Sequence, residues 1–275
     1  MTREIGNVQA DDTAGTLFRA GRLGEAIAAA SARLRKEPNS LAGRLMLAEL
    51  LVFAGNLERA DSQMVTAAAI DPSIAIVAAE FRQLLRAEQA RAGLLEQGRV
   101  PEFLSEGPTA AQRAALACVV AMRDGDMASA VRHAATAEEI RPRTGFVIGD
   151  NRVEDFRDAD DVICASLEVL TPTGKYLWIP FERIARLAFH PPQRPRDLIW
   201  RRATLEVAAG PAGEVYVPVL YAGASAEADD ALKLGRAIDW RELADGLTRG
   251  AGQRMFVSGE DGMPIMQLPP MVREG

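Results

Sequence analysis

A repeat of about 34 residues runs through the first half of the chain. The string AGRL at residues 20–23 returns as AGNL at residues 54–57, and Pro38 returns as Pro72, each 34 residues later. A third copy follows the second after 70 residues and contains Gly125, Ala130, Ala137 and Pro142. This period is typical of the tetratricopeptide helix–turn–helix repeat.

Each repeated residue type has a structural reason. A Gly at the turn permits the positive φ at which one helix ends and the next begins. The Ala positions let two helices approach closely, and the Pro ends the second helix because it cannot continue it. Residues 73–96, which lie between the second and third copies, have the pattern of one long helix. We therefore expect a stack of about seven helices with a continuous groove along it.

The composition changes near residue 144, where Val, Ile, Tyr, Trp, Pro and Gly become prominent and short alternating runs begin. We expect GPAG at residues 210–213 to join two strands as a hairpin, and residues 224–232 to form a loop or one helical turn. The predicted fold class is α+β, with a tetratricopeptide-like helical repeat array at residues 1–143 and a small antiparallel β-rich domain at 144–275. The predicted strands are residues 166–170, 175–179, 184–189, 203–207, 215–221, 254–257 and 265–268.

Composition excludes several classes of function. Lys and Arg number 32 against 38 Asp and Glu, a net charge of −6, which argues against a nucleic-acid-binding surface. Cys118 and Cys164 are isolated, and without CxxC or HExxH motifs a zinc site is not expected. Neither a signal peptide nor an apolar run long enough for a membrane span is visible, so we expect a cytoplasmic protein.

The remaining reactive groups give no catalytic set. The acidic run at residues 154–161 has the oxygen ligands that Mg²⁺ or Ca²⁺ prefers, but its spacing favours a solvated linker between domains. His133 and His190 have no identifiable partner for general-base catalysis, and GAGQR at residues 250–254 lacks the helix of a dinucleotide-binding loop. Cys118 takes the repeat position of Ala48, where we expect a buried small side chain. We therefore assign no catalytic, cofactor-binding or metal-binding residues.

Large side chains in the second half favour structural roles. Trp178, Trp200 and Trp240 are the only Trp residues, and we expect them to anchor a small core or the seam between the two halves. Charged residues near them are expected to form satisfied ion pairs, with a shared peptide-binding role as the less favoured alternative. These residues are Arg183, Asp197 and Arg254.

Six strings together resemble the ImpE family, also called TagJ, accessory proteins of bacterial type VI secretion. They are LLVFAGNLERA (50–60), AEQAR (87–91), GKYLWIPFERI (174–184), PRDLIW (195–200), LGRAIDW (234–240) and GAGQR (250–254). The resemblance extends from about Leu17 to Leu268. It implies a cytoplasmic, non-enzymatic adaptor that binds the N-terminal helix of the small sheath subunit and is linked to the AAA+ ATPase that disassembles the sheath. It carries over no set of binding residues.

Two other hypotheses remain open at this point. In one, the β-rich half is a small-molecule or metal-binding module, or an enzyme, and the repeats are an oligomerisation arm. Asp158, Asp160, Asp161 and Arg254 would then line a pocket. In the other, the chain is a chaperone for an exported protein and binds hydrophobic segments broadly. The oligomeric state is left open.

Overall fold

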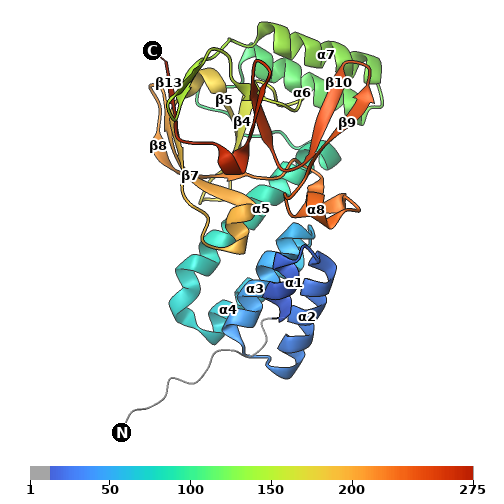
Figure 1. The fold of residues 1–275 in the computed structure, drawn as a ribbon, viewed down its shortest axis with the longest axis vertical. Coiled ribbons are helices and arrows are strands. Elements are labelled where there is room, and N and C mark those ends of the chain that lie inside the picture. The colour runs from blue at the N-terminus through green and yellow to red at the C-terminus, as the bar shows by residue number, and fades with distance from the viewer. Residues whose placement is uncertain (1–12, 275) are drawn as a thin grey trace.

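Helices fill the first half of the chain and strands the second, as Figure 1 shows for the computed structural model, which describes residues 13–274. The predicted α+β class is confirmed, and seven α-helices precede the first strand in this part of the chain. They are α1 (Thr13–Arg19), α2 (Leu23–Lys36), α3 (Leu41–Phe53), α4 (Leu57–Ile70), α5 (Ala75–Gln97), α6 (Ala110–Arg123) and α7 (Met127–Ile140).

The repeated positions have the geometry that their residue types predict. The turn glycines Gly21, Gly55 and Gly125 all have positive φ, of 81°, 70° and 78°. The repeated alanines at positions 26, 60 and 130 are 0% exposed. Helices α2, α4 and α7 each end two residues before a Pro, at positions 38, 72 and 142. The helix predicted from residue 73 begins with a short 3-10 turn, η1 (Pro72–Ile74), and continues as α5.

The expected single stack with a continuous groove is wrong. Helix α5 has 23 residues, whereas α3 has 13 and α4 has 14. At 1.5 Å per residue α5 is about 34 Å long. It carries the chain from α1–α4 at one end of the molecule to α6 and α7 at the other (Figure 1). The third repeat copy therefore packs beside the β-rich half, where α7 contacts β9 (Ile238–Ala244) and β10 (Leu247–Gly252).

An eight-stranded antiparallel sheet forms the centre of the second half, in the order β2-β1-β13-β6-β7-β8-β4-β5. A two-stranded sheet, β10-β9, and a three-stranded sheet, β12-β11-β3, flank it. The remaining bounds are β1 (Phe146–Ile148), β2 (Asn151–Val153), β3 (Arg157–Asp158), β4 (Ser166–Leu170), β5 (Tyr176–Pro180), β6 (Ile184–Phe189), β7 (Trp200–Val207), β8 (Ala212–Pro218), β11 (Met255–Ser258), β12 (Asp261–Pro264) and β13 (Met271–Arg273).

Six of the seven predicted strands are present, and two of them, β4 and β6, have the predicted bounds. The seventh, at residues 265–268, is wrong because it contains the 3-10 turn η5 (Ile265–Gln267) between prolines. Such a turn places residues three apart on one side, and Ile265 and Leu268 are both buried. The predicted hairpin at residues 210–213 joins β7 to β8. Residues 224–232 contain the short turn η4 (Ala224–Ala226) and the start of α8 (Asp230–Lys233).

Two contacts fix the helical end of the molecule to the β-rich half. The N–H of Leu23, at the start of α2, donates to Asp230 of α8 at 2.8 Å. The guanidinium of Arg236 donates to the carbonyls of Phe18 and Arg19 at the end of α1. Among residues 13–274 no helix is long and apolar enough to cross a membrane.

Candidate functional site

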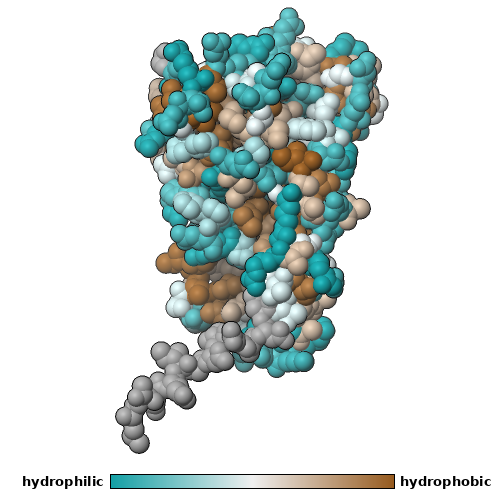
Figure 2. All heavy atoms as spheres, in the orientation of Figure 1, coloured by the Kyte–Doolittle hydropathy of each residue, from teal (hydrophilic) through white to brown (hydrophobic). Residues whose placement is uncertain are grey.

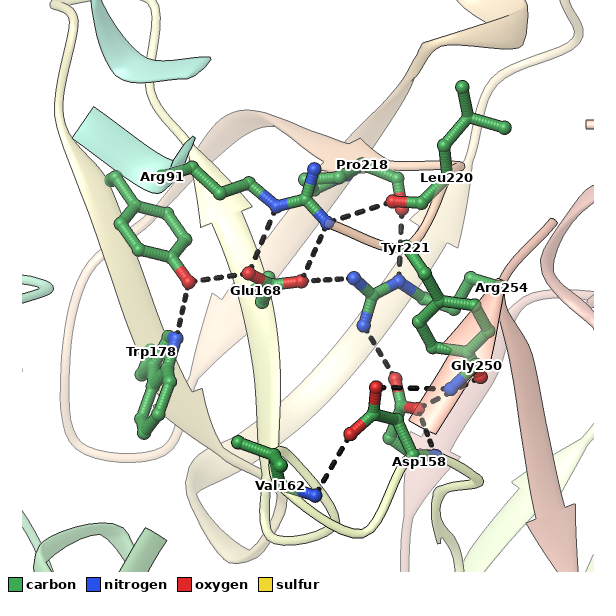
Figure 3. Close-up of polar contacts among 12 residues, drawn as sticks. Arg91, Asp158, Val162, Glu168, Trp178, Pro218, Leu220, Tyr221, Gly250 and Arg254 are labelled. Carbon is green, nitrogen blue, oxygen red and sulfur yellow. Dashed lines mark hydrogen bonds and ion pairs between the residues drawn. The ribbon is translucent and has the colours of Figure 1, made fainter. Parts of the chain in front are cut away.

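A buried network of charged side chains joins α5 to the sheet (Figure 3). Arg91 of α5 donates to both carboxylate oxygens of Glu168 on β4, with N–O distances of 2.9 and 3.0 Å, and to the carbonyl of Leu220 at 2.8 Å. Glu168 also accepts a hydrogen bond from Tyr176, whose hydroxyl accepts one from Trp178 Nε1 at 2.6 Å. The network therefore connects the helical half to the centre of the β-rich half.

Arg254 lies on the other side of Glu168 and pairs with it and with Asp158. Its Nη1 is 2.5 Å from Asp158 Oδ2, and its Nε donates to the carbonyl of Pro218 at 3.0 Å. Asp160 accepts from Arg249 Nε at 3.0 Å. Arg254, Asp158 and Asp160 are each 0% exposed. The expectation that residues 154–161 form a solvated linker is thus wrong for these acids, because arginines about 90 residues later in the chain pair with them inside the fold.

Burial and pairing act in opposite directions on the two carboxyl groups of this network. Burial raises the pKa of Asp158 to about 7, although Arg254 lowers it. Burial also raises the pKa of Glu168, but Arg91 and Arg254 outweigh it and hold that pKa well below its usual range. Glu168 is therefore an ionised, saturated acceptor, which suits a structural connection. In the described part of the chain no group of three or more His, Cys, Asp or Glu side chains is placed to hold a metal ion.

The other residues named from the sequence lie apart. Arg183 pairs with Glu106, and Asp197 accepts the backbone N–H groups of Gln193 and Arg194, which caps the turn η3 (Pro195–Leu198). His190 Nε2 lies 3.1 Å from Thr204 Oγ1. The half-buried His133 is on α7.

The aromatic and sulfur predictions are mostly confirmed. Trp178 and Trp200 are buried, and Trp200 donates to Glu88 of α5 at the seam between the halves. Trp240 is 39% exposed, so its predicted core role is wrong, because β9 lies at the edge of the two-stranded sheet. Cys118 is 0% exposed, as is Ala48 at the matching repeat position. Cys164 is buried as well.

A cleft of about 680 Å³ lies between the helical and β-rich halves. One wall is the second half of α5, another is the turn from α3 to α4 at residues 52–58, and the third is the loop at residues 220–225. A Cβ atom built on Gly55 would lie 2.7 Å from Ser225 Oγ, so the turn and the loop touch and close one side of the cleft. Arg91 and Leu220 of the buried network line this cleft.

The length of α5 creates the cleft. Helix α4 packs along α5 but has only 14 residues, so the last turns of α5 extend past the start of α4 at Leu57. The α5 side chains that face this space are Glu88, Gln89, Ala92, Leu95, Glu96 and Gln97. Ala92 is small enough to let a second helix axis approach within about 8–10 Å. The space therefore has the position and shape of a missing helix in line with α4.

A second, shallower hollow of about 310 Å³ continues the cleft along α4 and α5, with Leu57, Glu58 and Gln89 in the walls of both. Further along the same two helices, apolar side chains gather on the surface shown in Figure 2. Among them, Ile76 is 83% exposed and Val65 is 46% exposed. The α4–α5 face thus combines a cleft, a hollow and an apolar patch.

Sequence reasoning missed the cleft. It treated residues 73–96 as an insert in a continuous stack, whereas the structure uses the extra length of α5 to separate two groups of helices. The available signal was the helix length, since 23 residues exceed the helices of a 34-residue repeat by about two turns. The loop at residues 220–225 comes from the second half, and no local pattern connects it to α5.

Comparison with known proteins shows what the chain resembles. Residues 150–271 match the family model described as ImpE protein. A Pseudomonas aeruginosa protein named type VI secretion system accessory component TagJ is 31% identical over 245 residues, which cover 88% of this chain and 84% of that protein. The crystal structure of protein VPA1032 from Vibrio parahaemolyticus superimposes with a TM-score of 0.89 at 25% identity, covering 96% of this chain and 98% of that one. The similarity therefore includes both halves and the α5 connection between them.

Proposed function

Because this chain belongs to the ImpE family, we propose that it is an accessory component of a bacterial type VI secretion system that acts as a non-enzymatic adaptor. In this role it binds the N-terminal amphipathic helix of the small sheath subunit and links the sheath to the AAA+ ATPase that disassembles it. The family resemblance suggests these partners. The observation that carries the proposal is the cleft along the unpaired end of α5.

The cleft suits a helix better than a small reacting molecule. Its floor is apolar, with Phe53, Leu57, Leu95 and Leu220 among its lining residues. An amphipathic helix binds such a groove with apolar side chains spaced three and four residues apart. The charged residue nearest the floor, Arg91, is already bonded to Glu168, Glu88 and Leu220, so it is not free to act on a substrate.

A binding titration tests this proposal. The probe is a fluorescently labelled synthetic peptide of the N-terminal helix of the small sheath subunit from the same bacterium, and the full chain is titrated into it. We expect saturable binding by the wild-type chain, and at least tenfold weaker binding by Ala92→Trp, which places an indole in the cleft. The matched control is Ala79→Trp, at an exposed position of α5 outside both hollows, which should bind within twofold of wild type.

Two outcomes would contradict the proposal. Absence of saturable binding by the wild-type chain would remove the sheath helix as the partner. Wild-type affinity in Ala92→Trp would move the binding site away from the cleft. If circular dichroism shows that Ala92→Trp is unfolded, Gln89→Trp replaces it, because Gln89 is exposed and lines both hollows.

A second experiment tests the link to the ATPase. The chain is immobilised and the AAA+ ATPase is applied alone and together with the sheath-subunit peptide. We expect retention of the ATPase in at least one of these arms. Loss in both arms, under conditions in which the peptide itself is retained, would leave an adaptor for the sheath alone.

A further inference from the structure

Charge is distributed unevenly along the cleft and the hollow that continues it. Toward the end of α5, the lining carries the carboxylates of Glu58, Glu88 and Glu96. Glu88 is bonded to Arg91, but within residues 13–274 neither Glu58 nor Glu96 forms an ion pair. This end of the site is therefore acidic.

The opposite end carries positive charge. Arg82 and Arg86 line the second hollow, together with Asp61 and Glu58. Arg82 is paired with Asp61 at 2.6 Å, whereas Arg86 is exposed and makes no ion pair in the described part of the chain. The unpaired charges thus change from negative at Glu96 to positive at Arg86 along one face of α5.

Helix dipoles add to this gradient. The C-terminal end of α5, at Gln97, carries partial negative charge beside Glu96. The N-terminal end of α4, at Leu57, carries partial positive charge where the cleft meets the hollow. The C-terminal end of α3 at Phe53 lies near that N-terminus and opposes it in part. A bound helix has a positive N-terminus and a negative C-terminus, so its two orientations differ in energy.

We infer that the cleft holds its partner helix antiparallel to α5, with a basic N-terminal turn beside Glu96 and the C-terminal end directed toward Arg86. In this orientation the bound helix runs in the same direction as α4 and leads into its N-terminus. The inference rests on the proposed function and specifies the direction and charge of the helix. From position 86 to position 96 the path is about 15 Å, which fits about ten residues, or three turns.

Disulfide trapping measures the direction. Cysteines are introduced singly in the full chain as Glu96→Cys and Arg86→Cys, and the sheath-subunit peptide carries one Cys at either its N-terminal or its C-terminal end. The native cysteines do not compete, because Cys118 and Cys164 are 0% exposed and burial raises the pKa of their thiols to about 11 and about 12. The matched control is Arg35→Cys, at an exposed position of α2 away from the cleft.

We expect Glu96→Cys to trap the N-terminal label at least fivefold faster than the C-terminal label, and Arg86→Cys to show the reverse preference. The opposite pair of preferences would overturn the inferred direction. Trapping no faster than in Arg35→Cys, with peptide affinity retained in the titration, would place the helix elsewhere and overturn the inference while the proposed function stands. Loss of peptide binding by the wild-type chain would remove the proposed function itself.

Discussion

Arg91 of α5 and Glu168 of β4 face each other in a two-pronged ion pair, with N–O distances of 2.9 and 3.0 Å and both side chains 3% exposed. The two residues are 77 positions apart and belong to different halves of the chain. The planar guanidinium matches a carboxylate in this geometry, which fixes the orientation of both side chains. The pair therefore sets the position of α5 against the sheet, and with it the shape of the cleft.

Glu168→Gln tests how much this pair stabilises the fold. The substitution leaves Arg91 and Arg254 buried without their shared counter-ion, and removal of one partner from a buried pair costs about 3–5 kcal/mol. We expect the free energy of unfolding, measured by urea denaturation, to fall by that amount. Glu214→Gln is the control, since its pair with Arg202 is about half exposed and should contribute less than about 1 kcal/mol. Equal losses in the two variants would contradict a structural role for the network.

Glu49 gives the fold a dependence on pH. Burial raises its pKa to about 7, while Arg196 lowers it, Asp197 raises it and Arg194 lowers it. Since the folded-state pKa exceeds the unfolded value of 4.5, the protonated form stabilises the fold. That stabilisation is complete below about pH 4.5 and is lost as the pH rises through about 7.

The substitution Glu49→Gln isolates this effect. The variant is neutral at every pH, so its free energy of unfolding should rise relative to wild type by about 1–3 kcal/mol between pH 5 and pH 8. Urea denaturation at a series of pH values measures the difference. Glu58→Gln, at an exposed position, should show a constant difference from wild type. A constant difference for Glu49→Gln as well would show that Glu49 is ionised throughout.

Gly250 is required for packing. A Cβ atom there would lie 2.1 Å from Cε2 of the buried Tyr221, whose hydroxyl donates to Asp158. Gly250→Ala should therefore lower the free energy of unfolding by about 1–3 kcal/mol, the usual cost of overpacking. Gly213→Ala is the matched control in a strand, because no atom lies within 4 Å of its added Cβ. Thermal denaturation that ranks the two variants the other way would contradict this packing argument.

Asp230 couples the first helices to the β-rich half by capping α2 from α8. Asp230→Ala leaves the N–H of Leu23 without its acceptor, and loss of such a cap costs about 1 kcal/mol. We expect faster amide hydrogen exchange in α2 with little change in the sheet. Asp124→Ala, exposed at the end of α6, serves as the control and should leave α2 unchanged. Uniform acceleration over the whole chain would show that the contact supports global rather than local stability.

Glu96→Gln tests the charge of the partner. Removing one unpaired carboxylate from the cleft should weaken binding of the sheath-subunit peptide about two- to fivefold at low ionic strength. The difference should shrink at 0.5 M salt, where screening acts over only a few ångströms. Titration by fluorescence anisotropy at both salt concentrations provides the measurement. Tighter binding by Glu96→Gln would indicate an acidic partner surface at this end of the cleft.

Local patterns in the sequence predicted the features that depend on local geometry. The glycines at 21, 55 and 125 have positive φ because a helix-to-helix turn of this length requires it. The helix start after residues 107–109 was also readable, and the side chains of Thr109 and Gln112 form a capping box there. Strand β9 was not, because its residues are almost all exposed and alternate in no regular way.

Features that depend on distant partners were not readable. Asp158 and Asp160 are in an acidic run that is typical of solvated loops, and only the return of the chain at residues 249–254 buries them. The cleft likewise needs α5, the α3–α4 turn and residues 220–225 to meet. Pairings across such distances are determined by the whole fold, so a single sequence without homologues gives no register for them.

The 23-residue helix α5 has a mechanical consequence. It lies against α4 at one end and against β4 and β5 at the other, and Arg91 fastens it to Glu168 beside the cleft. A pulling force on a captive helix would enter α5 directly and pass into the β-rich half through one continuous beam, without a hinge in between. The molecule is thus built to transmit a load as one piece.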